Sequence, residues 1–206
     1  DWRINRFEGS WTDFDQGKLR RTGNVFDVAI SGKGFFVVDT PEGNQYTRNG
    51  TFIRNNEGTL TNLLGHAVLD EGGDQIQVPG TFTSPIIDGG GNIKGRDELL
   101  GIDSNLGRLQ IVDFPDLYDP NFSAQSPFQK ALNKSKDGYF IPQPGVTQVP
   151  AEEYEIAQGF LEESNVETVL EMVKMIDVFR SYEADQKALQ IQDETLDRAV
   201  NDVGVV

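Results

Sequence analysis

Residues 25–38 read VFDVAISGKGFFVV, two short apolar runs on either side of a glycine-containing turn. Apolar runs of this length, bounded by turn residues, are typical of β-strands. The turn at residues 31–34 is superficially similar to a phosphate-binding loop, but the third glycine of that motif would fall at Val37, and a strand rather than a helix follows. We therefore expect two strands joined by a hairpin turn.

The same pattern continues after this stretch. Strands are expected at residues 45–48, 51–54, 59–62 and 66–69, separated by turns that contain Gly and Asn. Because Gly and Asn tolerate the positive φ angles of tight turns, the spacing predicts an antiparallel meander. Later, residues 88–92 form the clearest loop, and strands are expected near Leu109 and Ile111 and near Tyr154 and Ile156. Residues 114–150, rich in Pro, Asp, Asn and Ser, predict long irregular connections.

Glycine and proline divide the chain into two parts. The 22 Gly and 9 Pro are spread over the first three quarters, and almost none follow Gly159. We expect a β-rich domain over residues 1–158 and a helical segment over 159–206. Within the β-rich domain, the sequence gives the weakest secondary-structure signal at residues 80–150. The predicted fold class is mainly β, built of antiparallel hairpins, with a long C-terminal α-helix.

The helical segment has a start signal and no interruption. Ser164 and Glu167 have the spacing of a capping box, and no Gly or Pro breaks residues 165–203. One helix of about 35 residues, roughly 50 Å long, is therefore allowed. A domain of this size is too small to cover such a helix along its whole length.

An apolar seam follows the predicted helix in heptads, with Gln186 and Asp193 as polar members. The seam either folds back over the β domain, or it protrudes and pairs with another chain or with a segment outside the given sequence. The length of the helix favours protrusion. On that interpretation the subunit-interface residues are Val169, Met172, Val173, Met175, Ile176, Phe179, Tyr182, Leu189, Leu196 and Val200.

Composition excludes several classes of function. The chain has 206 residues, and 18 Lys plus Arg against 33 Asp plus Glu give a net charge of −15. Such a chain lacks the clustered positive surface of a nucleic-acid binder. No apolar run approaches the roughly 20 residues that cross a bilayer, so membrane insertion is not expected. The absence of cysteine removes disulfides, thiolate metal sites and cysteine nucleophiles.

No motif supports catalysis. His66 is the single histidine, and no GxSxG turn accompanies it. The acidic residues Asp70, Glu71 and Asp74 lack the alternating spacing of an EF-hand loop. Tyr46 and Arg48 are polar groups beside apolar neighbours and are better explained as structural. We therefore predict no catalytic, cofactor-binding or metal-binding residues, no cofactor and no enzyme activity.

Two segments of the chain resemble the shared signature of bacterial flagellar rod and hook proteins. The first spans residues 17–58, and the second begins with GFLEESNV at 159–166 and continues to Lys187. Within the family, the sequence at residues 13–24 and 65–69 is more similar to that of the proximal rod protein than to that of the distal one. The motif residues, interpreted as scaffold, are Thr22, Gly23, Asn24, Asp27, Gly32, Gly34, Phe35, Phe36, Tyr46, Thr47, Arg48, Gly50 and Phe52.

The resemblance implies a structural subunit of the flagellar basal-body rod. Members of this family polymerise helically through terminal helices into a periplasmic shaft that transmits motor torque, and the β-rich domain forms the outer layer. Expected partners are copies of the chain, other rod and hook proteins and the type III export apparatus, with no cleaved signal peptide. The N-terminal helix of the family pattern is missing before Asp1, which leaves the C-terminal seam without its usual partner.

Other interpretations of the sequence are a hook or hook-associated structural protein, an acidic binding module with a coiled-coil tail, and a secreted hydrolase that uses two carboxylates. The binding module predicts a defined oligomer rather than an open filament. The hydrolase predicts a deep cleft with two acids about 5 to 9 Å apart.

Overall fold

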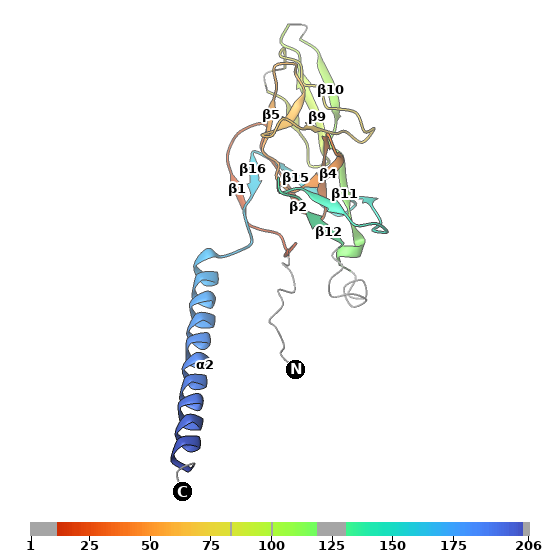
Figure 1. Ribbon diagram of the computed structural model, residues 1–206. Coiled ribbons are helices and arrows are strands. Elements are labelled where there is room, and N and C mark those ends of the chain that lie inside the picture. Colours follow the sequence, from red (N-terminus) through yellow and green to blue (C-terminus); the bar gives the residue numbers. More distant parts are fainter. Residues whose placement is uncertain (1–11, 83, 100, 119–130, 204–206) are drawn as a thin grey trace. The chain divides into compact units, whose positions relative to one another are not determined.

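The computed structural model describes residues 12–82, 84–99, 101–118 and 131–203, with side chains described up to Arg198. It is mainly antiparallel β-strand with one long C-terminal helix, as predicted (Figure 1). The chain divides into two compact units, a β unit that ends at Glu163 and a helical unit that begins at Ser164.

The largest sheet of the β unit has nine strands. Its main path runs β12–β13–β4–β3–β7–β6–β5, and β11 pairs with both β3 and β14 beside this path. The strands are β3 (Phe35–Thr40), β4 (Gly43–Thr47), β5 (Phe52–Arg54), β6 (Leu60–Asn62), β7 (Ala67–Val68), β11 (Ile111–Asp113), β12 (Leu132–Lys134), β13 (Phe140–Pro142) and β14 (Val149–Pro150).

Three smaller sheets are also present among the described residues of the β unit. A three-stranded sheet has the order β10–β9–β8, and two-stranded sheets pair β1 with β16 and β2 with β15. A 3-10 turn, η1 (Pro115–Leu117), follows β11. The strands are β1 (Leu19–Arg21), β2 (Val28–Gly32), β8 (Ile86–Ile87), β9 (Asn92–Arg96), β10 (Asp103–Arg108), β15 (Tyr154–Gln158) and β16 (Phe160–Glu162).

The core lies on both faces of β3. Side chains alternate between the faces of a strand, so Phe35 and Val37 enter one buried cluster and Phe36 and Val38 enter another. All four are at most 1% exposed. A run of four consecutive buried apolar residues at the start of a strand is typical of the centre of a sheet with both faces covered.

The predicted hairpin at residues 31–34 is wrong. Strand β2 pairs with β15 and β3 pairs with β4, β7 and β11, so the turn is a corner between two sheets. Gly32 and Gly34 have φ angles of +110° and +124°. A Cβ on Gly32 would lie 2.4 Å from the carbonyl oxygen of Glu153, which shows how closely the neighbouring backbone approaches the corner.

The meander is confirmed only in part. Strands β3 and β4, β5 and β6, and β6 and β7 are antiparallel neighbours, but β7 returns to pair with β3. The stretch at residues 114–150 contains η1, β12, β13 and β14, three of which join the large sheet. The strands in this stretch form by pairing with segments that are far away in sequence. Local composition does not encode such pairing, so the sequence did not predict these strands.

The helical unit contains α2 (Thr168–Val203). The predicted capping box at Ser164 is wrong, because the Oγ of Ser164 accepts a hydrogen bond from the N–H of Val166, at 3.2 Å. The first helical bond runs from the N–H of Glu171 to the carbonyl of Glu167, at 3.0 Å. Residues 160–162, expected in the helical segment, form strand β16 instead. Over the described residues, no helix combines the length and apolarity that a membrane span requires.

Candidate assembly interface

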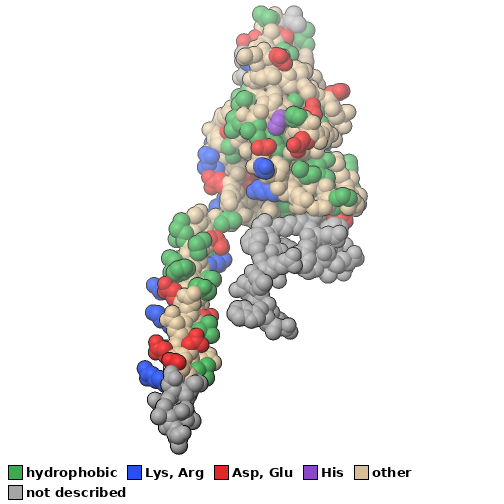
Figure 2. Space-filling model, in the orientation of Figure 1, with side chains coloured by type: hydrophobic (Ala, Val, Ile, Leu, Met, Phe, Trp, Pro, Cys, Tyr) green, Lys and Arg blue, Asp and Glu red, His purple; other side chains and the backbone are tan. Residues whose placement is uncertain are grey.

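The predicted seam lies on α2 and is exposed. Over its described residues the helical unit contains a single helix, with no second element against which the apolar side chains of α2 can pack. Exposed fractions in the seam run from 49% at Val173 to 75% at Val169, and Figure 2 shows hydrophobic side chains along the visible face of α2. The side chain of Val200 lies outside the described residues. The other predicted interface residues, all exposed, are Met172, Met175, Ile176, Phe179, Tyr182, Leu189 and Leu196.

The heptad pattern missed part of this apolar surface. Leu170, Val178 and Ile191 are exposed by 50%, 69% and 63% and lie off the seam. At about 100° per residue, the apolar side chains between residues 169 and 179 point in every direction around the helix. The high density of apolar residues in these first turns, rather than their heptad period, is the sequence signal that could have predicted this additional apolar surface. The first turns of α2 therefore present more apolar surface than one partner helix covers.

The two family-like segments meet where the chain enters and leaves the β unit. The carbonyl of Gly159 accepts hydrogen bonds from the N–H groups of Thr22 and Gly23, at 2.8 and 3.1 Å. The N–H of Gly159 donates to the carbonyl of Asp27 at 2.7 Å, and the side-chain amide of Asn24 donates to the Asp27 carboxylate at 3.0 Å. Strand β1 then pairs with β16. The last strand before α2 is thus held by residues from the start of the chain.

Arg48 ties this strand pair to the corner between the sheets. Its guanidinium donates to the carbonyls of Gly34 and Gly32 at 3.1 and 2.5 Å, and pairs with Glu162 at 3.3 Å. Glu162 Oε1 also accepts from the N–H of Gly17 at 2.9 Å. The side chains of Arg48 and Glu162 are only 16% and 10% exposed. Glu162 Oε2 is buried and has no hydrogen-bond partner among the described residues. Sequence reasoning assigned Arg48 a structural role but missed Glu162, because the two residues are far apart in sequence.

The remaining motif residues lie inside the β unit. Phe35, Phe36 and Phe52 are at most 1% exposed. Tyr46 and Thr47 are buried, and the hydroxyl of Tyr46 donates to the side-chain carbonyl of Gln148 at 2.6 Å. Burial raises the pKa of Tyr46. A Cβ on Gly50 would lie 1.7 Å from the carbonyl oxygen of Val28, so only glycine fits there without movement of the backbone.

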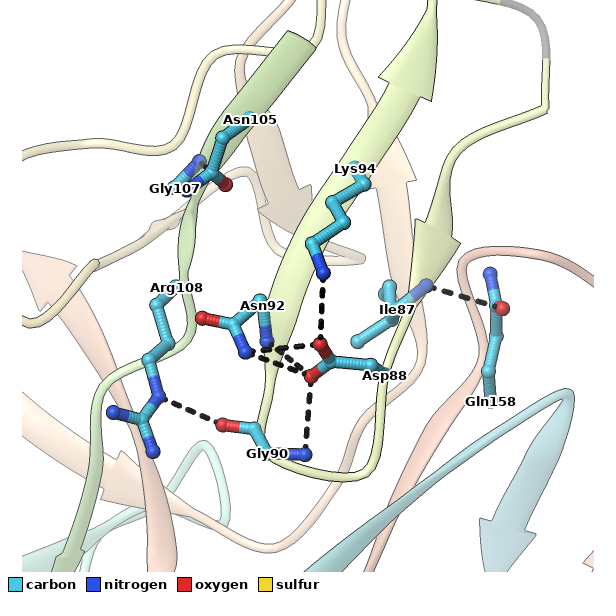
Figure 3. A network of polar contacts seen from close by, with 9 residues as sticks. All are labelled: Ile87, Asp88, Gly90, Asn92, Lys94, Asn105, Gly107, Arg108 and Gln158. Atoms are coloured by element: carbon cyan, nitrogen blue, oxygen red, sulfur yellow. Dashed lines mark hydrogen bonds and ion pairs between the residues drawn. The ribbon is translucent and has the colours of Figure 1, made fainter. Parts of the chain in front are cut away.

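The polar network of Figure 3 consists of structural contacts around the turn between β8 and β9. The Asp88 carboxylate accepts hydrogen bonds from the N–H of Gly90 and from the backbone and side chain of Asn92, at 2.9 to 3.1 Å, and pairs with Lys94 at 3.4 Å. The hydrogen bond from the Asn92 side chain is the main cause that lowers the pKa of Asp88. Arg108 donates to the carbonyl of Gly90 at 2.8 Å. The donors around Asp88 hold the turn.

The residues weighed for catalysis are not assembled into a site. Nδ1 of His66 lies 2.7 Å from the hydroxyl of Tyr139, which also accepts a hydrogen bond from Asn62 at 2.6 Å. A surface hollow of about 660 Å³ is lined by Lys33, Tyr118 and Glu153 among others, but the Glu153 side chain is 79% exposed and pairs with Lys33. In the described part of the chain, no group of three or more His, Asp or Glu side chains has an arrangement that could hold a metal ion.

Comparison with known proteins identifies the family. Residues 29–95 match the family model "Flagellar hook protein FlgE/F/G D1 domain", and residues 157–202 match "Flagellar basal body rod FlgEFG protein C-terminal". The flagellar basal-body rod protein FlgF of Mesorhizobium japonicum is 35% identical over 188 residues, which cover 91% of this chain and 71% of the relative. The chain belongs to the flagellar basal-body rod protein family. FlgF of Caulobacter vibrioides is 32% identical over 94% of this chain and 72% of its own length. FlgG of Bacillus subtilis is 33% identical over 87% of this chain and 66% of its own length.

The matches place the exposed seam within family sequence. The C-terminal model covers the end of β15, all of β16 and nearly all of α2, while the D1 model begins in β2 and ends in β9. The rod protein is a structural subunit of the flagellar basal-body rod, as predicted. The relatives given above are named as flagellar basal-body rod proteins.

Proposed function

We propose that the rod protein polymerises helically through α2 and that the polymer forms the periplasmic shaft that transmits torque from the motor. The observation that carries this proposal is the exposed seam of α2. Burial of one large apolar side chain stabilises an association by about 1.5 to 3 kcal/mol. A helical unit that has nothing of its own to cover such a surface gains this free energy only from a partner.

In this proposal the two parts of the chain have different tasks. Residues 1–158 form an outer domain, and residues 159–206 form the polymerisation segment with the interface residues given above. Inside the β unit, the contacts of Gly159 and of Glu162 with residues 17–48 fix β16, the last strand before α2. The motif residues from Thr22 to Phe52 act as scaffold.

The partners follow from the same proposal. Heterologous contacts repeated from subunit to subunit generate an open helix, so copies of this chain and other rod and hook proteins are the expected neighbours. Export through the flagellar type III apparatus without a cleaved signal peptide, and a position in the periplasmic rod of the proximal type, rest on the family alone. The subunit works without catalysis or cofactor, because stiffness rather than chemistry is its task.

Deletion of the gene in its own bacterium tests the proposal. Basal bodies isolated from the mutant and viewed by electron microscopy are expected to lack a complete rod, and complementation with the wild-type gene is expected to restore it. Complete rods that lack a hook would instead favour the hook interpretation. Normal rods and hooks in the mutant would refute the structural role.

A further inference from the structure

Three Asn–Gly or Asp–Gly pairs occur in the chain, at residues 49–50, 88–89 and 137–138. In such a pair the backbone nitrogen of the glycine can attack the side-chain carbonyl carbon of the preceding residue and close an imide ring. Glycine permits this attack because it has no Cβ that blocks the approach. The two kinds of pair differ in their leaving group. The neutral amide of Asn loses ammonia, whereas an ionised Asp carboxylate is a poor electrophile.

The two aspartate pairs are protected in the folded chain. The Asp88 carboxylate accepts hydrogen bonds from the N–H groups of Gly90 and Asn92 and from the Asn92 side chain, at 2.9 to 3.1 Å, and these bonds favour its ionised form. At the last pair, the N–H of Gly138 donates to the carbonyl of Ser135 at 3.2 Å. A nitrogen whose proton is held in a hydrogen bond is a weaker nucleophile, because it must give up that proton to react.

Asn49 and Gly50 combine the features that the other pairs lack. Asn49 is exposed, and among the described residues neither its side-chain nitrogen nor the N–H of Gly50 has a hydrogen-bond partner. The Asn49 side-chain oxygen accepts a hydrogen bond from the N–H of Thr51 at 3.1 Å. This bond folds the side-chain carbonyl over the Gly50 peptide. The same donor stabilises the negative charge that develops on this oxygen when the Gly50 nitrogen attacks.

Gly50 itself is fixed in the β unit. It is buried, and its carbonyl accepts a hydrogen bond from the N–H of Val28 at 3.0 Å. The exposed Asn49 side chain therefore moves onto a nitrogen that stays in place.

We propose that Asn49 is a site at which the folded chain is modified without an enzyme, by loss of its side-chain amide. The Gly50 nitrogen forms a bond to Cγ of Asn49, the bond from Cγ to Nδ2 breaks, and ammonia leaves with the proton of the Gly50 nitrogen. Water then opens the imide ring. Attack of water at Cγ leaves aspartate at this position. Attack at the main-chain carbonyl carbon leaves isoaspartate, in which the main chain runs through Cβ and Cγ.

The isoaspartate product does not fit the packing at Gly50. It lengthens the main chain and adds a negative charge one residue away from Arg48. A Cβ on Gly50 would lie 1.7 Å from the carbonyl oxygen of Val28, so the backbone has no room for an added carbon. The modification therefore breaks the hydrogen bond between Val28 and Gly50. It also displaces Arg48 from the corner between the sheets and from Glu162.

Peptide mapping of the full chain during incubation at mildly alkaline pH tests the proposal. Mass spectrometry follows the conversion of each amide to an acid, and chromatography separates the aspartate and isoaspartate forms. Asn105 is a matched control within the same chain. It is exposed and its side-chain oxygen accepts from the N–H of Gly107 at 3.3 Å, but Leu106 follows it. We expect Asn49 to convert at least about tenfold faster than Asn105, which corresponds to a barrier lower by about 1.4 kcal/mol.

Two variants separate the chemistry from its consequence. Asn49→Gln would have to close a larger ring, which is slower, and is expected to abolish the modification of this peptide. Asn49→Asp carries the new charge without the longer main chain. We expect the aged wild-type chain, once rich in isoaspartate, to unfold at a lower urea concentration than freshly prepared Asn49→Asp.

Two outcomes would overturn the proposed site. They are equal conversion of Asn49 and Asn105, and conversion of Asn49 in the urea-unfolded chain but not in the folded one. An isoaspartate-rich chain that unfolds at the same urea concentration as Asn49→Asp would refute the structural consequence. None of these measurements depends on assembly of the rod, so they test the site separately from the proposed function.

Discussion

Arg48 and Glu162 form the most consequential residue contact in the β unit. Arg48 reaches two carbonyls of the corner between sheets, and Glu162 belongs to the last strand before α2. Removal of one member of a nearly buried ion pair leaves the other charge without its opposite charge, which costs about 3 to 5 kcal/mol. Replacement of both charges removes that penalty.

A double-mutant cycle measures this contact. Arg48→Met is expected to lower the free energy of unfolding by about 3 kcal/mol, because Glu162 then stays buried and charged and the Gly32 and Gly34 carbonyls lose a donor. Arg48→Met with Glu162→Met should cost less than the sum of the single changes, measured by urea unfolding. Additive costs within about 0.5 kcal/mol would show that the two side chains are not coupled.

Asp88 gives the fold a specific dependence on acid. Its pKa in the folded chain is lowered, chiefly by the Asn92 side chain, so the ionised form is favoured by folding. The stability that results is fully present above the unfolded pKa of about 4 and is lost as the pH falls through the lower folded value.

The stability difference between wild type and Asp88→Asn should therefore be larger at pH 6 than at pH 3. Urea unfolding of both proteins at both pH values checks the expectation. A difference that stays constant from pH 6 to pH 3 would contradict the assigned role of the Asp88 hydrogen bonds.

Among the elements, β3 carries the core on both of its faces. Phe35→Ala and Phe36→Ala are each expected to cost about 3 to 5 kcal/mol, since each removes a buried ring and leaves a cavity. Ile53→Ala in β5, where the side chain is 42% exposed, is the control and should cost clearly less. A near-zero change in unfolding free energy for both phenylalanines would show that β3 is not central.

The second element-scale prediction concerns α2. Within its own unit it buries no apolar face, and tertiary packing supplies most of the stability of helices in proteins. In the isolated chain we expect the amide protons of α2 to exchange much faster than those of β3, measured by hydrogen–deuterium exchange. Protection of α2 equal to that of β3 would mean that the isolated chain already covers the seam.

Sequence predicted these elements to different degrees. The strands β3, β5 and β6 come from short runs bounded by turn residues, and the long helix follows a heptad pattern. Both signals depend only on neighbouring residues. The pairing of β2 with β15, and the strand at residues 160–162, depend on contacts such as Ile30 with Ile156 that join distant segments. The same reason hid Glu162, whose importance arises only where β16 meets Arg48.

At the scale of the whole molecule, we propose that the exposed apolar surface of α2 becomes buried when subunits assemble. The apolar side chains of the seam are exposed, and they lie in the segment that matches the rod-protein C-terminal family. The β unit has its own two buried clusters and does not depend on α2 for a core. In the proposed function, the β unit supplies the stability of the chain and α2 supplies its capacity for assembly.

Electron microscopy of basal bodies from cells that carry a seam variant tests this claim most directly. Leu189→Ser with Leu196→Ser alters the seam, while Ile191→Ser with Ala184→Ser alters the opposite face of the same helix and serves as the control. We expect cells to produce the seam variant but to assemble basal bodies without complete rods, whereas cells with the control variant assemble normal rods. Normal rods in cells with the seam variant would contradict it.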